Sequence, residues 1–473
     1  MAPPRLVRSF ASALALAAAT TVAGCHCGNK DTCDPARGDE DCNGGQVCEL
    51  VTDGDPMCFD PVIVAGIVYD TADGSPIEGA LVVALDANGT PVTDVAVSDA
   101  AGAYRLRVPN ERDADGNLTG GNVTLRASAD GYQTFPGGIR TALPIDLATA
   151  VATDGELVVM NTATDIGLIA VPGGGGLASI SGNVAAGTGV LVVAELAGGG
   201  AGLSAVSDRD GDYTVFNVPD GDYQVRGYAA DVQLVPADVT VAGADLTGVD
   251  LAVADTPLTT INGSVQIVNA PGGSTTSVVL VVASTFSATF ARGEVPPGLR
   301  APRTGPPDVS GAFTITGVPD GSYAVLAAFE NDGLVRDPDP AIAGTQIVFV
   351  DLPDPAGAVI DLADSFKVTE ALVVLGPGVD APEAVDAAPT LSWVDDSSED
   401  FYELRVYDAL GSEVWFQMVP GASGMDLAIP YGGPLDPGMF YQFRATSFRT
   451  PGGVPGPIST TEDLRGVFFL PAP

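Results

Sequence analysis

Apolar and polar residues alternate in short runs along most of the chain after residue 60. The runs are rich in Val, Ile, Tyr and Thr, and Gly, Asp, Asn or Pro interrupts them about every eight to twelve residues. Residues 81–85, 104–108 and 191–194 are examples, and no long window beyond the first segment has the period of a helix. Alternation with frequent turns is typical of antiparallel β-sandwiches. The pattern therefore predicts an all-β fold: tandem antiparallel β-sandwiches after a small disulfide-rich module.

An internal repeat runs through these strands. Residues 208–225 and 308–325 carry the same turn and strand signals in the same register, and a more divergent copy lies at 99–109. Each copy opens with Asp-x-x-Gly, which predicts a hairpin turn in which Asp accepts backbone hydrogen bonds and Gly takes positive φ. In the two closer copies, Val-Pro-Asp-Gly turns the chain again, into a strand opened by Tyr223 or Tyr323.

The first copy resembles the carboxypeptidase regulatory-like domain. Its opening strand at 66–70, its Gly-x-Pro-Ile-x-Gly-Ala turn at 74–80 and its Ala-x-Gly-Tyr at 129–132 occur in that family in this order. The second and third copies lack the Gly-x-Pro-Ile-x-Gly turn, so their first hairpin is not predicted. The resemblance implies transthyretin-like sandwiches at residues 61–172, 177–256 and 257–375.

The last segment departs from the repeat and resembles a fibronectin type III domain. Trp393 lies on an early strand, residues 402–407 alternate as Tyr-x-Leu-x-Val-Tyr, and Leu-x-Pro-Gly-x-x-Tyr ends at Tyr441. The resemblance implies a fourth sandwich at residues 381–473, with Tyr441 as its tyrosine-corner residue.

The first residues form an export leader. Arg5 and Arg8 precede a short apolar run, which ends at Ala23-Gly24 before Cys25. Such a run predicts a signal peptide at residues 1–24 and is too short to span a bilayer.

The residues Val22-Ala23-Gly24-Cys25 resemble the lipobox of bacterial lipoproteins. The resemblance implies a diacylglyceryl group on the Cys25 thiol, hence attachment to a membrane through covalent lipid. Position 26 is His rather than Asp. By analogy with that family, His26 favours an outer-membrane lipoprotein of the cell envelope. The alternative is a plain signal peptide, with Cys25 belonging to the module that follows.

Five further cysteines are crowded into residues 25–60, and none follows them. In an oxidising compartment, a small segment with almost no apolar core predicts disulfides. A zinc site is disfavoured because paired Cys-x-x-Cys knuckles are absent. If Cys25 carries lipid, one thiol is left over, and Cys27 is the expected one; the pairing stays open. The disulfide candidates are Cys27, Cys33, Cys42, Cys48 and Cys58.

The charge and the residue inventory exclude several functions. With 20 Lys and Arg against 60 Asp and Glu, the net charge of −40 repels phosphate backbones, so no nucleic acid partner is expected. The single histidine, His26, lies beside the lipid anchor. Neither a Ser-His-Asp triad nor a histidine-held zinc can therefore be built, and no enzyme is expected. No cofactor is expected apart from calcium.

Two acidic turns resemble calcium loops, because oxygen ligands stand at alternate positions beside a glycine. Each lacks the downstream Glu of an EF-hand, and the alternative is that Asp serves only the turn geometry. The candidate ligands are Asp208, Asp210 and Asp212 in one turn and Asp113, Asp115 and Asn117 in the other.

A Pro-rich loop at 296–307 carries Arg300 and Arg303, with Arg292 just before it, in an otherwise acidic chain. Such a loop is either a binding site or an insertion that drifted. Together these patterns predict a non-catalytic, lipid-anchored envelope protein that acts as a surface spacer, adhesion or binding scaffold. The alternative is a carbohydrate-binding accessory module of an envelope complex. Expected partners beyond the membrane are surface glycans or other envelope proteins.

Overall fold

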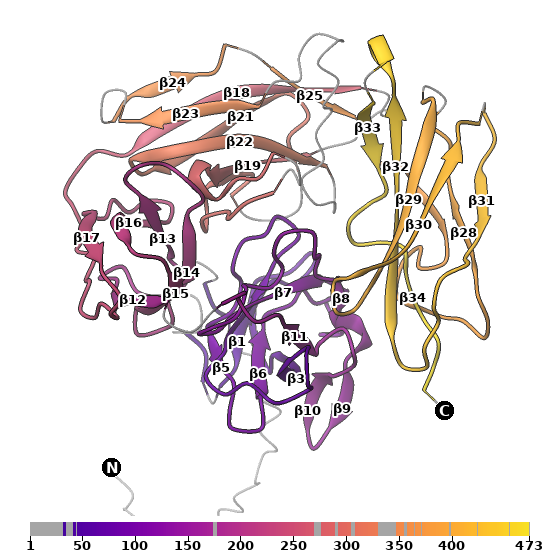
Figure 1. Cartoon of the computed structure of the whole chain (residues 1–473), viewed down its shortest axis with the longest axis horizontal. Coiled ribbons are helices and arrows are strands. Elements are labelled where there is room, and N and C mark those ends of the chain that lie inside the picture. Colours follow the sequence, from indigo (N-terminus) through magenta and orange to yellow (C-terminus); the bar gives the residue numbers. More distant parts are fainter. Residues whose placement is uncertain are drawn as a thin grey trace, which may run out of the picture.

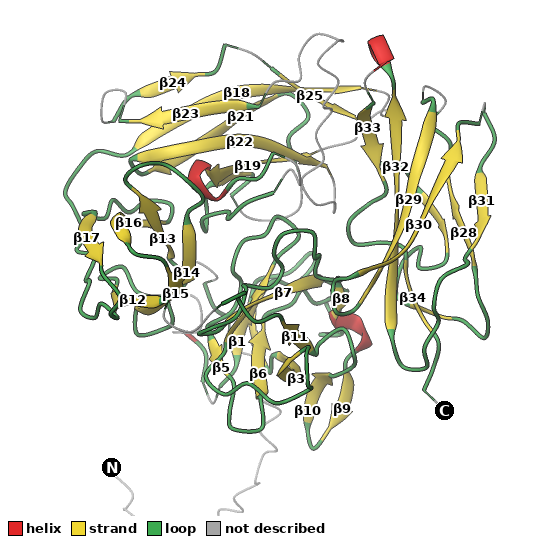
Figure 2. Cartoon of the chain, in the orientation of Figure 1, coloured by secondary structure: helices red, strands yellow, loops and turns green. Residues whose placement is uncertain are grey.

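The computed structural model describes most of the chain after residue 31. The described residues are 32–34, 41–43, 45–173, 177–268, 276–288, 292–303, 308–329, 347–353, 357–363, 365–369, 371–396, 399–422, 424–453 and 455–472. Nearly all of the regular structure in them is strand, and the helix consists of short 3₁₀ turns, among them η2 (Leu147–Thr149), η3 (Ala283–Thr285) and η4 (Pro451–Gly453) (Figure 2). The predicted all-β class is confirmed. No helix of the described residues is long and apolar enough to cross a membrane.

The cysteine-rich module is a small two-stranded sheet. Strand β1 (Val47–Glu49) pairs antiparallel with β2 (Met57–Phe59), and Cys48 lies opposite Cys58.

The remaining strands form four sandwich-like groups, which we call units one to four; the domain boundaries drawn from the sequence stay predictions. Unit one has the strands β3 (Val62–Asp70), β4 (Leu81–Leu85), β5 (Ala96–Val97), β6 (Ala103–Val108), β7 (Asn122–Ser128), β8 (Ile145–Asp146), β9 (Val151–Thr153), β10 (Glu156–Val159) and β11 (Ile166–Leu168). Unit two has β12 (Ala178–Asn183), β13 (Leu191–Leu196), β14 (Leu203–Val206), β15 (Asp212–Val218), β16 (Gly221–Tyr228) and β17 (Ala237–Val241).

Unit three has β18 (Thr259–Val268), β19 (Thr276–Val282), β20 (Arg300–Ala301), β21 (Ala312–Val318), β22 (Gly321–Phe329), β23 (Val348–Leu352), β24 (Val359–Asp361) and β25 (Phe366–Thr369). Unit four has β26 (Val374–Gly376), β27 (Glu383–Ala384), β28 (Thr390–Trp393), β29 (Phe401–Asp408), β30 (Glu413–Pro420), β31 (Leu427–Pro430), β32 (Phe440–Arg449), β33 (Gly456–Thr460) and β34 (Val467–Phe469).

Units one, two and three share one sheet topology. Their four-stranded sheets have the orders β5-β4-β7-β8, β14-β13-β16-β17 and β20-β19-β22-β23. The opening strand of each unit lies in the opposite sheet and pairs antiparallel with β6, β15 or β21. The sequence repeat is thus a repeat of strand order.

The two closer copies also share a register irregularity. In unit two the pairing of β12 with β15 shifts between Ala178 and Ile180, and in unit three that of β18 with β21 shifts between Thr259 and Ile261. Across each shift, β15 or β21 contributes one residue more than the strand it pairs with, as in a β-bulge. That residue has positive φ: Asn217 at 60° and Gly317 at 69°.

The predicted Asp-x-x-Gly turn forms in two of the three copies. Gly102 and Gly211 have φ of 75° and 83°, and their N–H groups donate to the carbonyls of Asp99 and Asp208. The expectation is wrong for Gly311, whose φ is not positive. The Gly311 carbonyl accepts the N–H of Val265 on β18, as the carbonyls of Gly102 and Gly211 accept those of Val68 and Val184, so this hydrogen bond does not explain the difference in φ.

Unit four consists of the sheets β26-β28-β31 and β27-β34-β32-β29-β30, with β33 beside β32. Trp393 and Tyr402 are fully buried between them, with ring centroids 5.5 Å apart in an edge-to-face arrangement. The hydroxyl of Tyr441 accepts the N–H of Asp436 at 2.9 Å.

The chain folds back on itself rather than extending. Figure 1 shows unit one in the lower centre, with unit two to its left, unit three above them and unit four to its right. Units two and three share one apolar cluster, in which Leu191, Val193 and Tyr228 pack with the core of unit three. The rings of Tyr228 and Tyr323 meet edge to face at 5.8 Å. Unit four packs against unit one, so the four units surround a common centre.

Candidate functional site

A pocket of about 760 Å³ lies where the four units meet. Its volume is within the ~300–1,000 Å³ range of small-molecule sites. Unit one supplies most of the wall, from the β4–β5 turn, β7 and the loop after it. Unit two contributes residues 202–204, unit three Thr285, Ser287 and residues 292–294, and unit four Arg444, Asp463 and Leu464. The site is therefore a product of how the units pack.

Arg126 of β7 ties three units together at this pocket. Its buried guanidinium lies 3.2 Å from the carboxylate of Glu294 in unit three and donates to the backbone carbonyl of Ser204 in unit two at 2.9 Å. The Ser204 hydroxyl accepts from Arg126 and donates to Glu294 at 2.7 Å. A buried network of this kind is stabilising when every member has a partner.

The Pro- and Arg-rich loop of unit three, expected to be either a binding loop or a drifted insertion, contacts the other units through each of its arginines. Arg292 donates to the carbonyl of Gly138 in unit one, and burial lowers the pKa of its guanidinium. Arg300 pairs with Asp86 of unit one at 2.5 Å, and Arg303 pairs with Asp231 of unit two. The loop therefore joins unit three to units one and two. Its residues 304–307 lie outside the described residues.

Unit four is held against unit one by a second set of contacts. Arg140 donates to the carbonyl of Leu410, which lies in the turn between β29 and β30. Burial lowers the pKa of Arg140 and raises that of Asp408 in the same turn. Thr162 donates to the carbonyl of Gly438 at 2.7 Å. A smaller pocket of about 310 Å³, which Thr153 lines, lies beside this contact.

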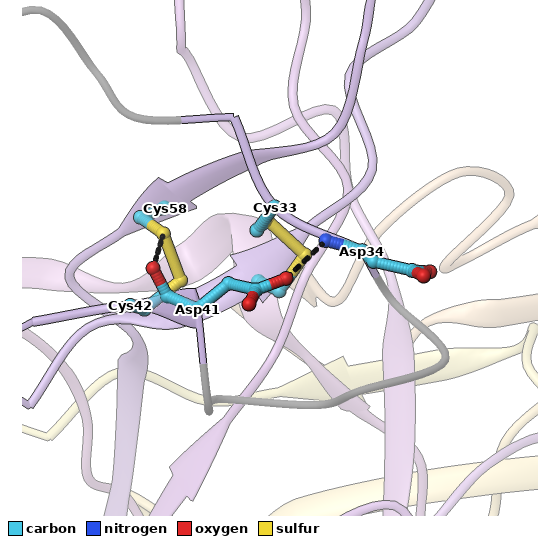
Figure 3. Close-up of a disulfide and its surroundings, with 6 residues drawn as sticks. Cys33, Asp34, Asp41, Cys42 and Cys58 are labelled. Atoms are coloured by element: carbon cyan, nitrogen blue, oxygen red, sulfur yellow. Dashed lines mark hydrogen bonds between the residues drawn. A yellow bond between two sulfur atoms is a disulfide. The ribbon is translucent and has the colours of Figure 1, made fainter.

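The cysteine prediction is confirmed for the described residues, and the structure fixes the pairing that the sequence left open. Cys33 is bonded to Cys48, and Cys42 is bonded to Cys58. Figure 3 shows this region, where the N–H of Asp34 donates to the Asp41 carboxylate at 3.1 Å. Cys25 and Cys27 lie outside the described residues, so the lipid site and the odd thiol stay predictions.

A buried ion pair fixes the module to unit one. The Arg112 guanidinium lies 2.5 Å from the Glu49 carboxylate, and neither side chain is more than 7% exposed. Arg112 also covers the ring of Phe59, 4.6 Å from its centroid. Burial raises the pKa of Glu49, and the hydrogen bond from Arg112 opposes that rise. The two-disulfide module is therefore continuous with the body of the protein.

The two calcium candidates are turns whose first aspartate is engaged by backbone amides. One Asp208 oxygen accepts the N–H groups of Asp210 and Asp212. Asp113 likewise accepts from Asp115 and Asn117, and the Asn117 side chain lowers the pKa of Asp113.

Within the described residues, the metal-ligand atoms that converge are those of Cys33, Cys42 and Cys58, which are all disulfide-bonded. Turn geometry thus accounts for the roles of Asp208 and Asp113. Calcium binding stays a prediction, checked by whether added calcium raises the melting temperature and a chelator lowers it.

Sequence reasoning missed the pocket itself. Its charged residues come from segments that each look unremarkable, and Arg126 and Glu294 are 168 positions apart. The cluster of Arg292, Arg300 and Arg303 was the available signal, because arginine is scarce in this acidic chain.

Comparison with known proteins gives no family. No protein-family model matches the chain. No curated protein matches it either. Among solved structures, the chain is similar to the Bacillus anthracis TIE protein, with 13% identity over 83% of this chain and 68% of that chain and a TM-score of 0.15.

Two pilins give comparable values. BcpA, the major pilin subunit of Bacillus cereus, is 12% identical over 65% of this chain and 99% of that chain, with a TM-score of 0.17. The shaft pilin SpaA from Lactobacillus rhamnosus GG is 11% identical over 41% of this chain and 98% of that chain, also with a TM-score of 0.17. TM-scores this low carry no inference about the function of this chain, and the fold is assigned from its own strands.

Proposed function

We propose that this protein is a non-catalytic scaffold of the bacterial cell envelope, held to a membrane by lipid on Cys25. Three carboxypeptidase regulatory-like sandwiches and one fibronectin type III-like sandwich form its body. The lipobox-like residues before Cys25 support the anchor, and the disulfides Cys33–Cys48 and Cys42–Cys58 support export to an oxidising compartment.

The single observation that carries the scaffold role is the set of ties between units. Arg126, Arg140, Arg300 and Arg303 each reach from their own unit to another, so the four sandwiches form one closed body. Because the body is closed, the scaffold presents surfaces on a compact particle and does not span a distance as an extended spacer would.

The domain assignments rest on topology. The sheet order of unit one recurs in units two and three, which supports three copies of one kind of domain. In unit four, the three-stranded and larger sheets, the buried Trp393 and the hydrogen bond to Tyr441 match what a fibronectin type III-like sandwich requires.

The anchor is tested by intact mass analysis of the mature protein, with Cys25→Ala and Cys27→Ala as matched variants. The unaltered protein and Cys27→Ala are expected to start at residue 25, carry acyl chains and fractionate with membranes. Cys25→Ala is expected to lose the acyl mass and keep or otherwise process its leader. Unacylated protein in the unaltered strain would contradict the proposal.

A further inference from the structure

The lining of the central pocket carries uncharged hydrogen-bonding groups. Six lining residues have neutral polar side chains that make no hydrogen bond within the described part of the chain. They are Asn88, Thr124, Gln133, Thr134, Thr141 and Ser287. Five come from unit one and one from unit three, and all face the same space. Hydroxyl and amide groups both donate and accept, so together they can satisfy a ligand of the same kind.

Each charged side chain of the lining has a partner within the protein: Asp86 pairs with Arg300, and Arg292 donates to the carbonyl of Gly138. Arg126 pairs with Glu294, and Arg444 pairs with Asp463. An anionic ligand would have to displace one of these partners and overcome a net charge of −40, and a cationic ligand would have to displace an arginine. A neutral ligand needs neither displacement.

The lining contains no aromatic side chain among the described residues, so it offers no flat apolar face for stacking an aromatic ring. Its uncharged hydroxyl and amide groups instead suit hydrogen bonds to a hydroxyl-rich molecule. We propose that the central pocket is a binding site for a neutral carbohydrate, held by these uncharged hydroxyl and amide groups between the charged pairs.

Such a ligand would also join the units. Thr134 belongs to unit one and Ser287 to unit three, and units two and four complete the wall. Binding at this position stabilises the closed arrangement over any in which the units separate, because only the closed form has the complete site.

Isothermal titration calorimetry on the purified full-length protein tests the site, with maltotriose, cellotriose, laminaritriose and chitotriose as probes. At least one is expected to bind saturably, at one site per chain, and to raise the melting temperature. Thr134→Val and Ser287→Ala should each weaken that binding about 5- to 10-fold, the effect of one lost hydrogen bond.

Thr153→Val is the matched control, because Thr153 lies at the smaller pocket and should leave the affinity unchanged. Circular dichroism checks that each variant is folded. Absence of saturable binding by all four probes overturns the proposal. So does affinity that is unaffected by Thr134→Val and Ser287→Ala, or tighter binding of a trigalacturonate, which would show a site for anions. None of these outcomes bears on lipid attachment at Cys25.

Discussion

Asn217 and Gly317 occupy the same place in consecutive units, one residue before the Val-Pro of the repeat. Both have positive φ, and both lie at a joint with the preceding unit. The Asn217 side chain accepts the N–H of Gly131 and donates to the carbonyls of Ala129 and Tyr132. The carbonyl of Gly317 accepts the N–H of Asp231, which follows β16 as Gly131 follows β7. One bulge residue thus docks each unit onto the one before it.

Two substitutions of Asn217 separate the contribution of its side-chain hydrogen bonds from that of its backbone conformation. Asn217→Gly removes three side-chain hydrogen bonds and should cost about 2–3 kcal/mol in the free energy of unfolding. Asn217→Ala should cost about 1 kcal/mol more, because alanine is strained at positive φ. Urea denaturation measures both, and equal stability of the two variants would contradict the backbone part of the argument.

Asp408 gives a pH dependence at the joint between units one and four. Burial raises the pKa of the Asp408 carboxyl group in the folded state. At low pH this group is neutral in both the folded and the unfolded state, so the folded protein holds no buried charge there. The stability present there is lost as pH rises through the folded-state pKa, since the folded protein must then hold a desolvated charge.

Asp408→Asn removes that charge while its amide oxygen can still accept the N–H of Ser412. The variant should melt about 2 °C above the unaltered protein at pH 7 and at the same temperature at pH 3. Differential scanning calorimetry at both values checks this, with Asp426→Asn as an exposed control in the same unit. A gain of equal size at pH 3 would rule out the titration of Asp408 as its cause.

In units two and three, the hairpin that ends in tyrosine is closely repeated. The hydroxyl of Tyr223 donates to the carbonyl of Pro219 at 3.0 Å, and that of Tyr323 donates to the carbonyl of Pro319 at 2.9 Å. Each bond closes the Pro-Asp-Gly turn from inside the sandwich, where both tyrosines are buried. Burial raises the pKa of both phenols, which keeps them as donors.

Tyr323→Phe and Tyr223→Phe form a matched pair for this hairpin. Each removes one hydroxyl and leaves a proline carbonyl without its partner, so each should cost about 1 kcal/mol in the free energy of unfolding. Urea denaturation followed by tyrosine and tryptophan fluorescence measures the loss. A cost in one unit only would show that the hairpins are not equivalent.

At the scale of the whole molecule, arginine side chains make many of the contacts that hold the sandwiches against one another. The chain has few cations, and many of those in the described residues join different units or fix the module to unit one. This use follows from the composition, because an arginine in a strongly acidic chain finds a carboxylate or carbonyl wherever two units meet. The closed body and its central pocket depend on these pairs.

Arg126→Met tests that dependence. It leaves Glu294 without its cation at a partly buried position and should cost about 3 kcal/mol. Arg105→Met is the matched control, since the Arg105–Glu156 pair is half exposed and should contribute less than about 1 kcal/mol. Small-angle X-ray scattering should show a larger radius of gyration for Arg126→Met alone. An equal loss of stability and an equal radius of gyration for the two variants would contradict the proposal that Arg126 holds the units together.

The fold class and the repeat could be predicted because their signals are local. Alternating side chains select strands, and Asp, Gly and Pro at fixed offsets select turns, so the residues that decide these features are neighbours in the chain. The turn at Gly311 was wrong although it carries the same Asp-x-x-Gly signal, and its hydrogen bond from Val265 has a counterpart in each of the other two copies, so nothing in the structure explains its different backbone. The cysteine count predicted bridges but not partners, because several pairings fit one spacing.

The sequence by itself determined an all-β chain with repeated strand order and a cysteine-stapled start. Tertiary structure alone decided that Arg126 contacts both Ser204 and Glu294 and that four units enclose a pocket. It also decided that the Pro- and Arg-rich loop of unit three contacts units one and two. The physical reason is the sequence separation between the residues that interact. Strands and turns follow from steric and hydrogen-bonding preferences of adjacent residues, whereas ties between units form only after whole sandwiches have folded and brought distant charges together.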